Sequence, residues 1–199
     1  MIVHSHPSAT PFVTLTAIWF GMMAAMMAPA VWPWVRSYHR FSATTGPAAV
    51  ASTIAFATGY LAVWLAYSAA AAFAQGHLRG IASFGSAIFL AAGLYQFAPF
   101  KRACLTHCRS PFGYFLSRWR NGPAGGFQMG AQHGAYCVGC CWALMATSLA
   151  VGAMSLWWMA ALGATAFIEQ TSPYGNPVRR AVGVALVVAA VFVLPSSGL

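Results

Sequence analysis

Acidic residues are almost absent from this sequence of 199 residues. It contains one carboxylate, Glu169, and no aspartate. Catalysis by a pair of carboxylates is therefore excluded, and so are the oxygen-rich sites that bind Mg²⁺ or Ca²⁺. Any chemistry must come from cysteine, histidine, methionine, tyrosine or tryptophan side chains, or from the backbone. The sequence designates no catalytic residue.

Charge of either sign is also scarce. Only 6% of the residues are charged, against about 25% in a typical soluble domain, and 60% are hydrophobic. The mean hydropathy of +0.68 agrees with a protein embedded in the lipid bilayer. The net charge of +9 does not indicate nucleic-acid binding, because the sequence lacks a surface stripe of basic and aromatic residues.

Six apolar runs approach or exceed the length of about 20 residues that a helix needs to cross a membrane. They cover residues 12–35, 48–75, 81–100, 126–151, 154–170 and 178–194. We therefore predict an all-α, polytopic membrane protein with six transmembrane helices, forming one domain over residues 1–199.

The basic residues indicate how these helices are oriented. Nine of the ten follow the first, third or fifth run: Arg36, Arg40, Lys101, Arg102, Arg109, Arg118, Arg120, Arg179 and Arg180. Only Arg79 lies on the other side of the membrane in this arrangement. Cytoplasmic loops are enriched in lysine and arginine, so the nine-residue side is predicted to be cytoplasmic and both termini non-cytoplasmic.

The most distinctive stretch lies in the fourth run. Cys137, Cys140 and Cys141 fall within five residues, with His133 one helical turn before them and Met145 one turn after. Polar and reactive groups are costly inside a membrane, and there they indicate function. Thiol, thioether and imidazole ligands together select soft metals such as Cu(I). The sequence leaves open which of the two adjacent cysteines faces the site.

Glycines recur at every fourth position of the same run, at Gly122, Gly126, Gly130 and Gly134. Small residues at this spacing form a groove that another helix can approach closely. We expect such a helix to pack here.

A methionine cluster occupies the middle of the first run. Met22 and Met26 share one helical face, and Met23 and Met27 share another. The cluster is predicted to lie at the same membrane depth as Cys137, so the two groups are candidates for one shared metal site. The alternative is packing, because methionine also fills irregular gaps between helices.

A second cysteine pair, Cys104 and Cys108, follows the third run and a predicted helix break at Pro99. If this segment is helical, both thiols lie on one face with His107 beside Cys104. Such an arrangement could chelate a soft ion, and the neighbouring basic residues are predicted to lower the thiol pKa values. The alternative is two buried cysteines that anchor a helix at the membrane surface.

Two further features lie on the predicted cytoplasmic side. Residues 111–120 alternate aromatic and basic side chains, which is typical of an interfacial segment, here between the third and fourth transmembrane helices. Glu169 is expected to pair with Arg179, Arg180 or another arginine of this face. It could instead be a metal ligand or a proton carrier.

The order of these motifs resembles a bacterial family of predicted metal-binding integral membrane proteins, catalogued as a domain of unknown function. The motifs are the stretch from Met23 to Pro29, Tyr95-Gln96 with Pro99 and Lys101, Cys104-Leu105 with Cys108-Arg109-Ser110-Pro111, Gly130 with His133-Gly134, the stretch from Cys137 to Met145, and Glu169. The usual basic residue after the glutamate is Gln170 here. The resemblance implies metal binding in the bacterial inner membrane and supplies no reaction.

We interpret the chain as a membrane protein that binds a soft transition metal, with copper as the expected ion, for handling or delivery. A metal chaperone or other membrane subunits are its expected partners. The candidate ligands are Cys137, Cys140, Cys141, His133, Met145, Cys104, Cys108, Met23, Met26, Met27, His107 and Glu169.

Three alternatives remain. Two cysteine pairs on a helical bundle also suit a thiol–disulfide oxidoreductase, although a pair on the reducing side argues against it. An abundance of small and aromatic residues suits an accessory subunit of a larger membrane complex, with His133 as an axial ligand of a haem or pigment. Transport of a toxic soft metal such as Hg(II) is the third.

Overall fold

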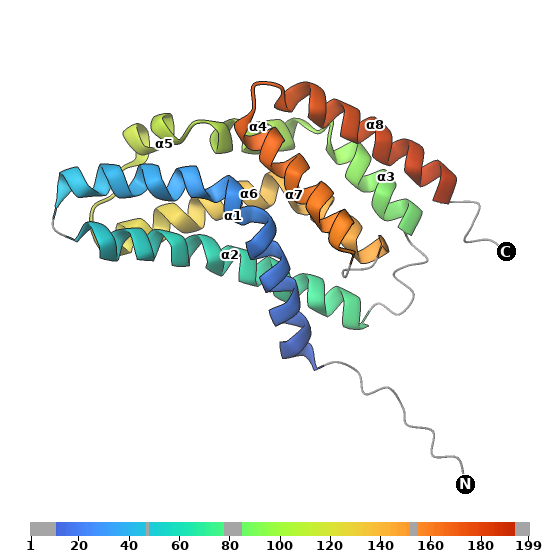
Figure 1. The fold of residues 1–199 in the computed structure, drawn as a ribbon, viewed down its shortest axis with the longest axis horizontal. Helices are drawn as coiled ribbons and strands as arrows, with labels where there is room; N and C mark the ends of the chain where they lie inside the picture. Colours follow the sequence, from blue (N-terminus) through green and yellow to red (C-terminus); the bar gives the residue numbers. More distant parts are fainter. Residues whose placement is uncertain (1–10, 47, 78–84, 152–154, 194–199) are drawn as a thin grey trace, which may run out of the picture.

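The computed structural model describes residues 11–46, 48–77, 85–151 and 155–193, which form eight α-helices and no strand (Figure 1). The helices are α1 Phe12–Thr45, α2 Ala49–His77, α3 Gly85–Tyr95, α4 Pro99–Arg109, α5 Pro111–Arg118, α6 Gly122–Val151, α7 Leu156–Thr171 and α8 Gly175–Val193. The predicted all-α fold is confirmed. The predicted position of Arg79, and the start of the fifth run at residue 154, lie outside the described residues.

Four of these helices are long and apolar enough to cross a membrane. The candidate spans are Phe12–Thr44, Ala49–Gly76, Gly122–Val151 and Gly175–Phe192. The third and fifth predicted spans correspond to α3 and α7, which have 11 and 16 residues. Both are shorter than the ~20 residues that an untilted crossing requires. The number of six spans and the side of the termini therefore stay predictions.

The third run is shorter than predicted because the helix breaks before Pro99. Helix α3 ends at Tyr95, a turn follows, and α4 begins at Pro99. Proline has no N–H and is favoured in the first turn of a helix, so it starts α4 rather than continuing α3. The predicted break is confirmed.

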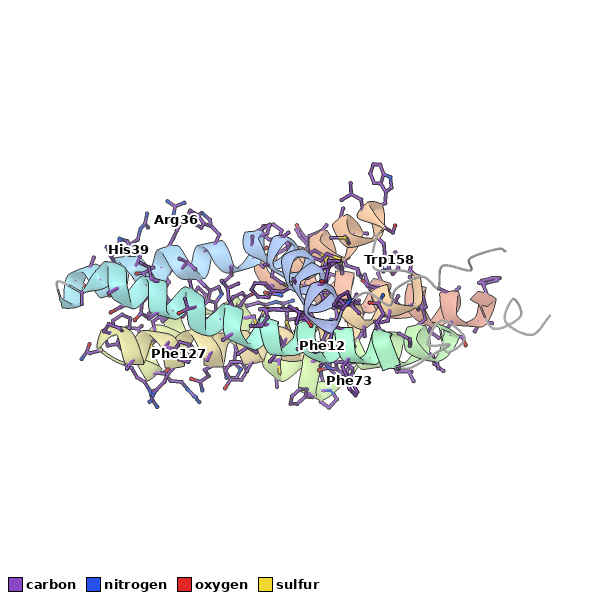
Figure 2. All side chains as sticks on the ribbon, turned by 90° about the horizontal axis from the view of Figure 1, so that it is seen from below. Phe12, Arg36, His39, Phe73, Phe127 and Trp158 are labelled. Atoms are coloured by element: carbon purple, nitrogen blue, oxygen red, sulfur yellow. The ribbon has the colours of Figure 1, made fainter. Side chains whose placement is uncertain are left out.

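Helix α1 continues ten residues beyond the predicted end at residue 35. It contains Pro29 and Pro33 in its interior, where the ring removes hydrogen bonds and bends the helix. Figure 1 shows this bend, with the two parts of α1 running in different directions. Arg36 projects from the outer face of the second part (Figure 2), and Nδ1 of His39 lies 3.1 Å from the hydroxyl oxygen of Thr53 on α2.

Helices α2 and α6 lie side by side along much of their length. A Cβ atom at Gly126 would lie 2.5 Å from the carbonyl oxygen of Ser52, and one at Gly134 would lie 3.1 Å from that of Tyr60. Side chains at these positions would separate the two backbones. The predicted glycine groove is confirmed at Gly126, Gly130 and Gly134, where α2 packs, whereas a Cβ atom at Gly122 would meet nothing within 4 Å.

The remaining helices enclose the middle of α6. Helix α4 packs against α6 and α7, α3 packs against α6 and α8, and α7 also contacts α1. Helix α5 packs its buried Tyr114 and Phe115 against Trp34 of α1, with ring centroids 5.5 Å apart in both pairs. Its Phe112 and Leu116 are exposed, which fits the amphipathic segment expected between residues 111 and 120.

Candidate metal centre

All five cysteine side chains lie buried in one hydrophobic cluster. Helix α6 supplies Cys137, Cys140 and Cys141, and α4 supplies Cys104 and Cys108. Each is at most 5% exposed, and all five are free thiols. Two segments separated by α5 therefore bring their thiols to the same part of the core.

Helix α4 directs its cysteines toward α6 because they share one helical face. The buried residues of α4 are Lys101, Cys104, Leu105 and Cys108, a spacing that forms a single stripe along the helix. The predicted helical arrangement of the cysteine pair is thus confirmed. The absence of a side chain at Gly139 lets Cys104 Sγ approach the backbone of α6.

Cys140 is the α6 thiol that meets α4. Cys140 and Cys108 interact across the α4–α6 contact, and Cys104 interacts electrostatically with Cys140. Cys141 interacts electrostatically with Tyr67 on α2. Both adjacent cysteines are buried.

Cys137 lies at the centre of the hydrogen bonds around the α6 thiols. Its carbonyl oxygen accepts bonds from the thiols of Cys140 and Cys141, at 3.1 and 2.9 Å. Its own sulfur lies 3.4 Å from the Tyr60 hydroxyl oxygen and 3.8 Å from the side-chain amide of Gln170. The carbonyl oxygen of Cys137 is therefore the acceptor that both of the other α6 cysteines share.

The predicted lowering of the thiol pKa values on α4 is wrong. Burial raises the pKa of Cys104, and interaction with Cys140 together with burial raises the pKa of Cys108. Lys101, on the same face, is held in an ion pair with Glu169. The raised pKa values favour the neutral thiol at both α4 positions.

His133 is buried beside the thiol cluster. Its ring stacks on Trp34 of α1, with centroids 3.8 Å apart and planes at 21°, and on Tyr60 at 5.6 Å. The Trp34 indole N–H donates to the carbonyl oxygen of Cys108 at 3.1 Å. His133 also interacts electrostatically with Cys140. Trp34 therefore joins α1 to both helices that carry thiols.

His107 lies at the edge of the centre rather than within it. It is half-buried, stacks on Tyr136 at 4.2 Å, and lines an open cavity of about 310 Å³ between α4 and α5. Its Nδ1 donates to the carbonyl oxygen of Ala103 at 2.8 Å, since a carbonyl can only accept. Nε2 is therefore the ring nitrogen that could bind a metal.

The methionines of α1 belong to the same hydrophobic cluster as the thiols. Met23, Met27 and Met145 are fully buried, and Met26 is nearly so. Met26 faces Gly163 of α7, where a Cβ atom would lie 3.5 Å from it. The contacts to the thiols described above come from α2, α4 and α7. The sharing of one metal site by the methionines and thiols stays a prediction.

Glu169 pairs with a lysine, not with an arginine as expected. Its Oε2 lies 2.7 Å from Nζ of Lys101, which also donates to the side-chain carbonyl of Gln96. Arg109 instead donates to the backbone carbonyl of Glu169, and Arg179 donates to that of Gln96. Lys101 takes the carboxylate because it shares the buried face of α4 with the cysteines, and α4 packs against α7.

The donor chemistry of the centre fits a soft monovalent cation. Among the described residues, no three or more histidine, cysteine or acidic side chains are grouped so as to hold a metal ion. The thiols instead meet in pairs, and Cu(I) can be held by a pair of thiolates. Thiol and thioether donors favour Cu(I) over the harder ions that carboxylates bind.

Sequence reasoning missed Tyr60, Gln170 and Trp34 as neighbours of the centre, and it did not predict that Lys101 pairs with Glu169. The inward direction of Lys101 could have been found, because it precedes Cys104 and Cys108 by three and seven residues and so shares their helical face. Tyr60 and Gln170 carry no local signal, since their role depends on how α2 and α7 pack against α6.

Comparison with known proteins shows that a family model matches most of the chain. Neither the curated proteins nor the solved structures contain a match to the chain. A family model described as PpoB2, copper chaperone, matches residues 16–193, a region that includes every cysteine and every methionine of the centre. The chain therefore belongs to the PpoB2 copper chaperone family, and copper handling is its general role.

Proposed function

We propose that this protein is an integral membrane protein that binds Cu(I) through cysteine thiolates and passes it to a partner. The observation that carries the proposal is the meeting of thiols from two helices, Cys108 of α4 and Cys140 of α6, in a core that also holds buried methionines. Soft sulfur ligands favour Cu(I), and the family description supports the same ion.

Copper is the cargo in this proposal, and the chain's own residues receive and release it. The thiols lose their protons when the metal binds, so uptake releases protons. Cys104 and Cys108 form the relay on the basic side of the molecule, and Cys137, Cys140 and Cys141 form the site within the membrane. Copper moves between them by exchange of one thiolate ligand for another. The donor or acceptor is a metal chaperone or another membrane subunit.

We place the protein in the bacterial inner membrane, with six spans and both termini on the non-cytoplasmic side. The distribution of arginine and lysine supports this orientation, and α3 and α7 would be the two short spans. Reporter fusions to both termini, and to the segment after Arg120, test it. A cytoplasmic reporter signal from either terminus would contradict the topology without affecting the copper site.

Metal analysis tests the copper site directly. The purified full-length protein is loaded with Cu(I), passed over a desalting column and compared with the Cys137→Ser/Cys140→Ser/Cys141→Ser variant. We expect copper to remain with the wild type and to be lost from the variant. A Cys104→Ser/Cys108→Ser variant should hold copper more weakly than the wild type but more tightly than the triple variant, because it keeps the three α6 thiols. Equal copper contents in the wild type and the triple variant would rule out the site.

A second function is favoured by the same thiol contact. Cys108 and Cys140 are close enough to share a hydrogen bond, so a thiol–disulfide oxidoreductase that cycles this pair is the alternative. Thiol counting after oxidant and after reductant separates the two functions. An unchanged number of free thiols rules out cycling.

A further inference from the structure

A buried cluster of polar side chains lies beside the thiols and carries more positive than negative charge. Lys101 and Glu169 form its central ion pair, with side chains 0% and 2% exposed. Arg109 donates to the backbone of Glu169 at 2.8 Å, and Arg179, which is 4% exposed, interacts electrostatically with the same carboxylate. Because Glu169 is the only acidic side chain of the sequence, the buried Lys101 and Arg179 and the half-buried Arg109 surround one anion.

Some buried polar atoms of this cluster form no hydrogen bond with the described residues. Gln96 Nε2, Arg179 Nε and Glu169 Oε1 are buried and have no hydrogen-bond partner among the described residues. Buried cations are unfavourable unless an anion lies close to them. The excess positive charge therefore favours a state of the protein in which a further negative charge forms nearby.

The cysteine thiols are the neighbouring groups that can supply this negative charge. Cys140 interacts electrostatically with both Lys101 and Glu169. Lys101 also shares the buried face of α4 with Cys104 and Cys108. Protonated thiols are neutral and do not offset the cluster, whereas thiolates bound to a metal ion do.

The charge of the bound complex depends on the metal. One Cu⁺ and two thiols give a copper–dithiolate complex of charge −1 and release two protons. One Hg²⁺ and two thiols also release two protons, but the mercury–dithiolate complex is neutral. In both cases each S–H bond breaks, a sulfur–metal bond forms, and no electron is transferred. Only the copper complex leaves a net negative charge in the buried centre.

We propose that the Lys101 cluster is the counter-charge of an anionic Cu(I)–dithiolate complex, so that the centre favours a monovalent soft cation over a divalent one. This inference rests on the copper binding proposed above. It gives Lys101 and Glu169 opposite effects, since Lys101 stabilises the anionic complex and Glu169 destabilises it. An ion pair with a purely structural role would give both residues the same effect.

The test compares the affinities of single-charge variants for two metals. Purified full-length wild type, Lys101→Met, Glu169→Gln and the double variant compete with a chromophoric chelator for Cu(I). Each is then titrated with Hg(II) in competition with a small dithiol. The absorbance of the metal–thiolate bond in the ultraviolet shows whether cysteines hold the metal in each sample.

We expect Lys101→Met to weaken Cu(I) binding by about tenfold or more, as a lost charge interaction in the protein interior should. Glu169→Gln should tighten Cu(I) binding by a similar factor, and the double variant should lie near the wild type. The glutamine keeps an oxygen that accepts from Lys101, so this variant preserves the local hydrogen bond. Hg(II) binding should change by less than about threefold in every variant.

Weaker Cu(I) binding in both single variants would overturn the proposal, because it would make the pair structural or Glu169 a ligand. An equal change for Hg(II) would also overturn it, since the centre itself would then be damaged. These outcomes leave the copper site intact in the wild type. If the wild type holds no copper, or the triple cysteine variant holds as much, both the proposed function and this inference are wrong.

Discussion

Cys104 of α4 lies directly against Gly139 of α6, so closely that a Cβ atom at position 139 would be 2.9 Å from the Cys104 sulfur. A Cβ atom at this position would require the Cys104 sulfur, which is the end of a side chain, to move. The contact lies where α4 and α6 both carry thiols.

Replacing Gly139 with alanine should therefore displace the Cys104 thiol from its place against α6. Overpacking of a dense core costs about 1–3 kcal/mol, and a loss of that size in binding free energy corresponds to Cu(I) binding weaker by roughly five- to 150-fold. Competition with a Cu(I) chelator measures the change. Gly21→Ala is the matched control, because Gly21 is also within a helix and a Cβ atom there meets nothing within 4 Å.

Alanine favours helix over glycine by about 1 kcal/mol, so Gly139→Ala should not unfold α6. Loss of copper from Gly139→Ala, with an unchanged circular dichroism spectrum, would support the contact. Equal affinities of the Gly139→Ala and Gly21→Ala variants would show that the contact of Cys104 with Gly139 does not control metal binding.

The contact of α2 with α6 makes a separate prediction about stability. A Cβ atom at Gly130 would collide with the backbone carbonyl of Phe56, and backbone atoms cannot move aside as a flexible side chain can. Gly130→Ala should lower the free energy of unfolding by at least about 1–3 kcal/mol. Thermal unfolding in detergent measures it, with Gly76→Ala as the control because that position of α2 is open. Equal midpoints for both variants would contradict the close packing.

Much of this arrangement could be predicted from local sequence patterns. The spacing of Cys104 and Cys108 predicts one helical face, Pro99 predicts the break before it, and the glycine repeat predicts a close helix contact. Each of these follows from the period of an α-helix or the geometry of one residue. Positions of this kind need no knowledge of the rest of the fold.

Which helix packs against each of these faces could not be predicted, because that depends on how helices distant in sequence cross one another. The glycine groove does not identify α2, and the cysteines of α6 do not identify α4. Glu169 was expected to pair with an arginine near in sequence, whereas its partner, Lys101, is 68 residues away on α4. The direction of the thiol pKa shifts was missed for the same reason, since burial depends on the packing of the helices.

The buried thiols of α4 predict how the stability of the metal-free protein depends on pH. The pKa values of Cys104 and Cys108 are raised in the folded state, so the folded protein holds both protons more tightly than the unfolded chain. Their contribution to stability is complete below the unfolded thiol pKa of about 8.5 and is lost as pH rises above it. We expect the free energy of unfolding to fall between about pH 8.5 and pH 10.

Chemical denaturation at a series of pH values measures this slope, and a Cys104→Ala/Cys108→Ala variant should show a smaller one. Tyr114 also has a raised pKa, of about 12, but its effect begins only near the ordinary tyrosine pKa of about 10. If the wild type and the variant show the same slope, the ionisation of these two thiols does not affect the free energy of unfolding.

The last prediction concerns the methionines of α1. It tests whether their sulfur atoms bind the metal or their side chains only pack in the core. Met23 and Met27 are fully buried in the hydrophobic cluster that contains the thiols, and Met129 is equally buried in a second cluster. Leucine conserves the volume of methionine and removes its sulfur. If thioethers hold copper in transit, Met23→Leu/Met27→Leu should speed the loss of Cu(I) to a chelator by about tenfold, while Met129→Leu should not. Equal rates in the two variants would assign the α1 methionines to packing and leave the thiols alone as the copper ligands.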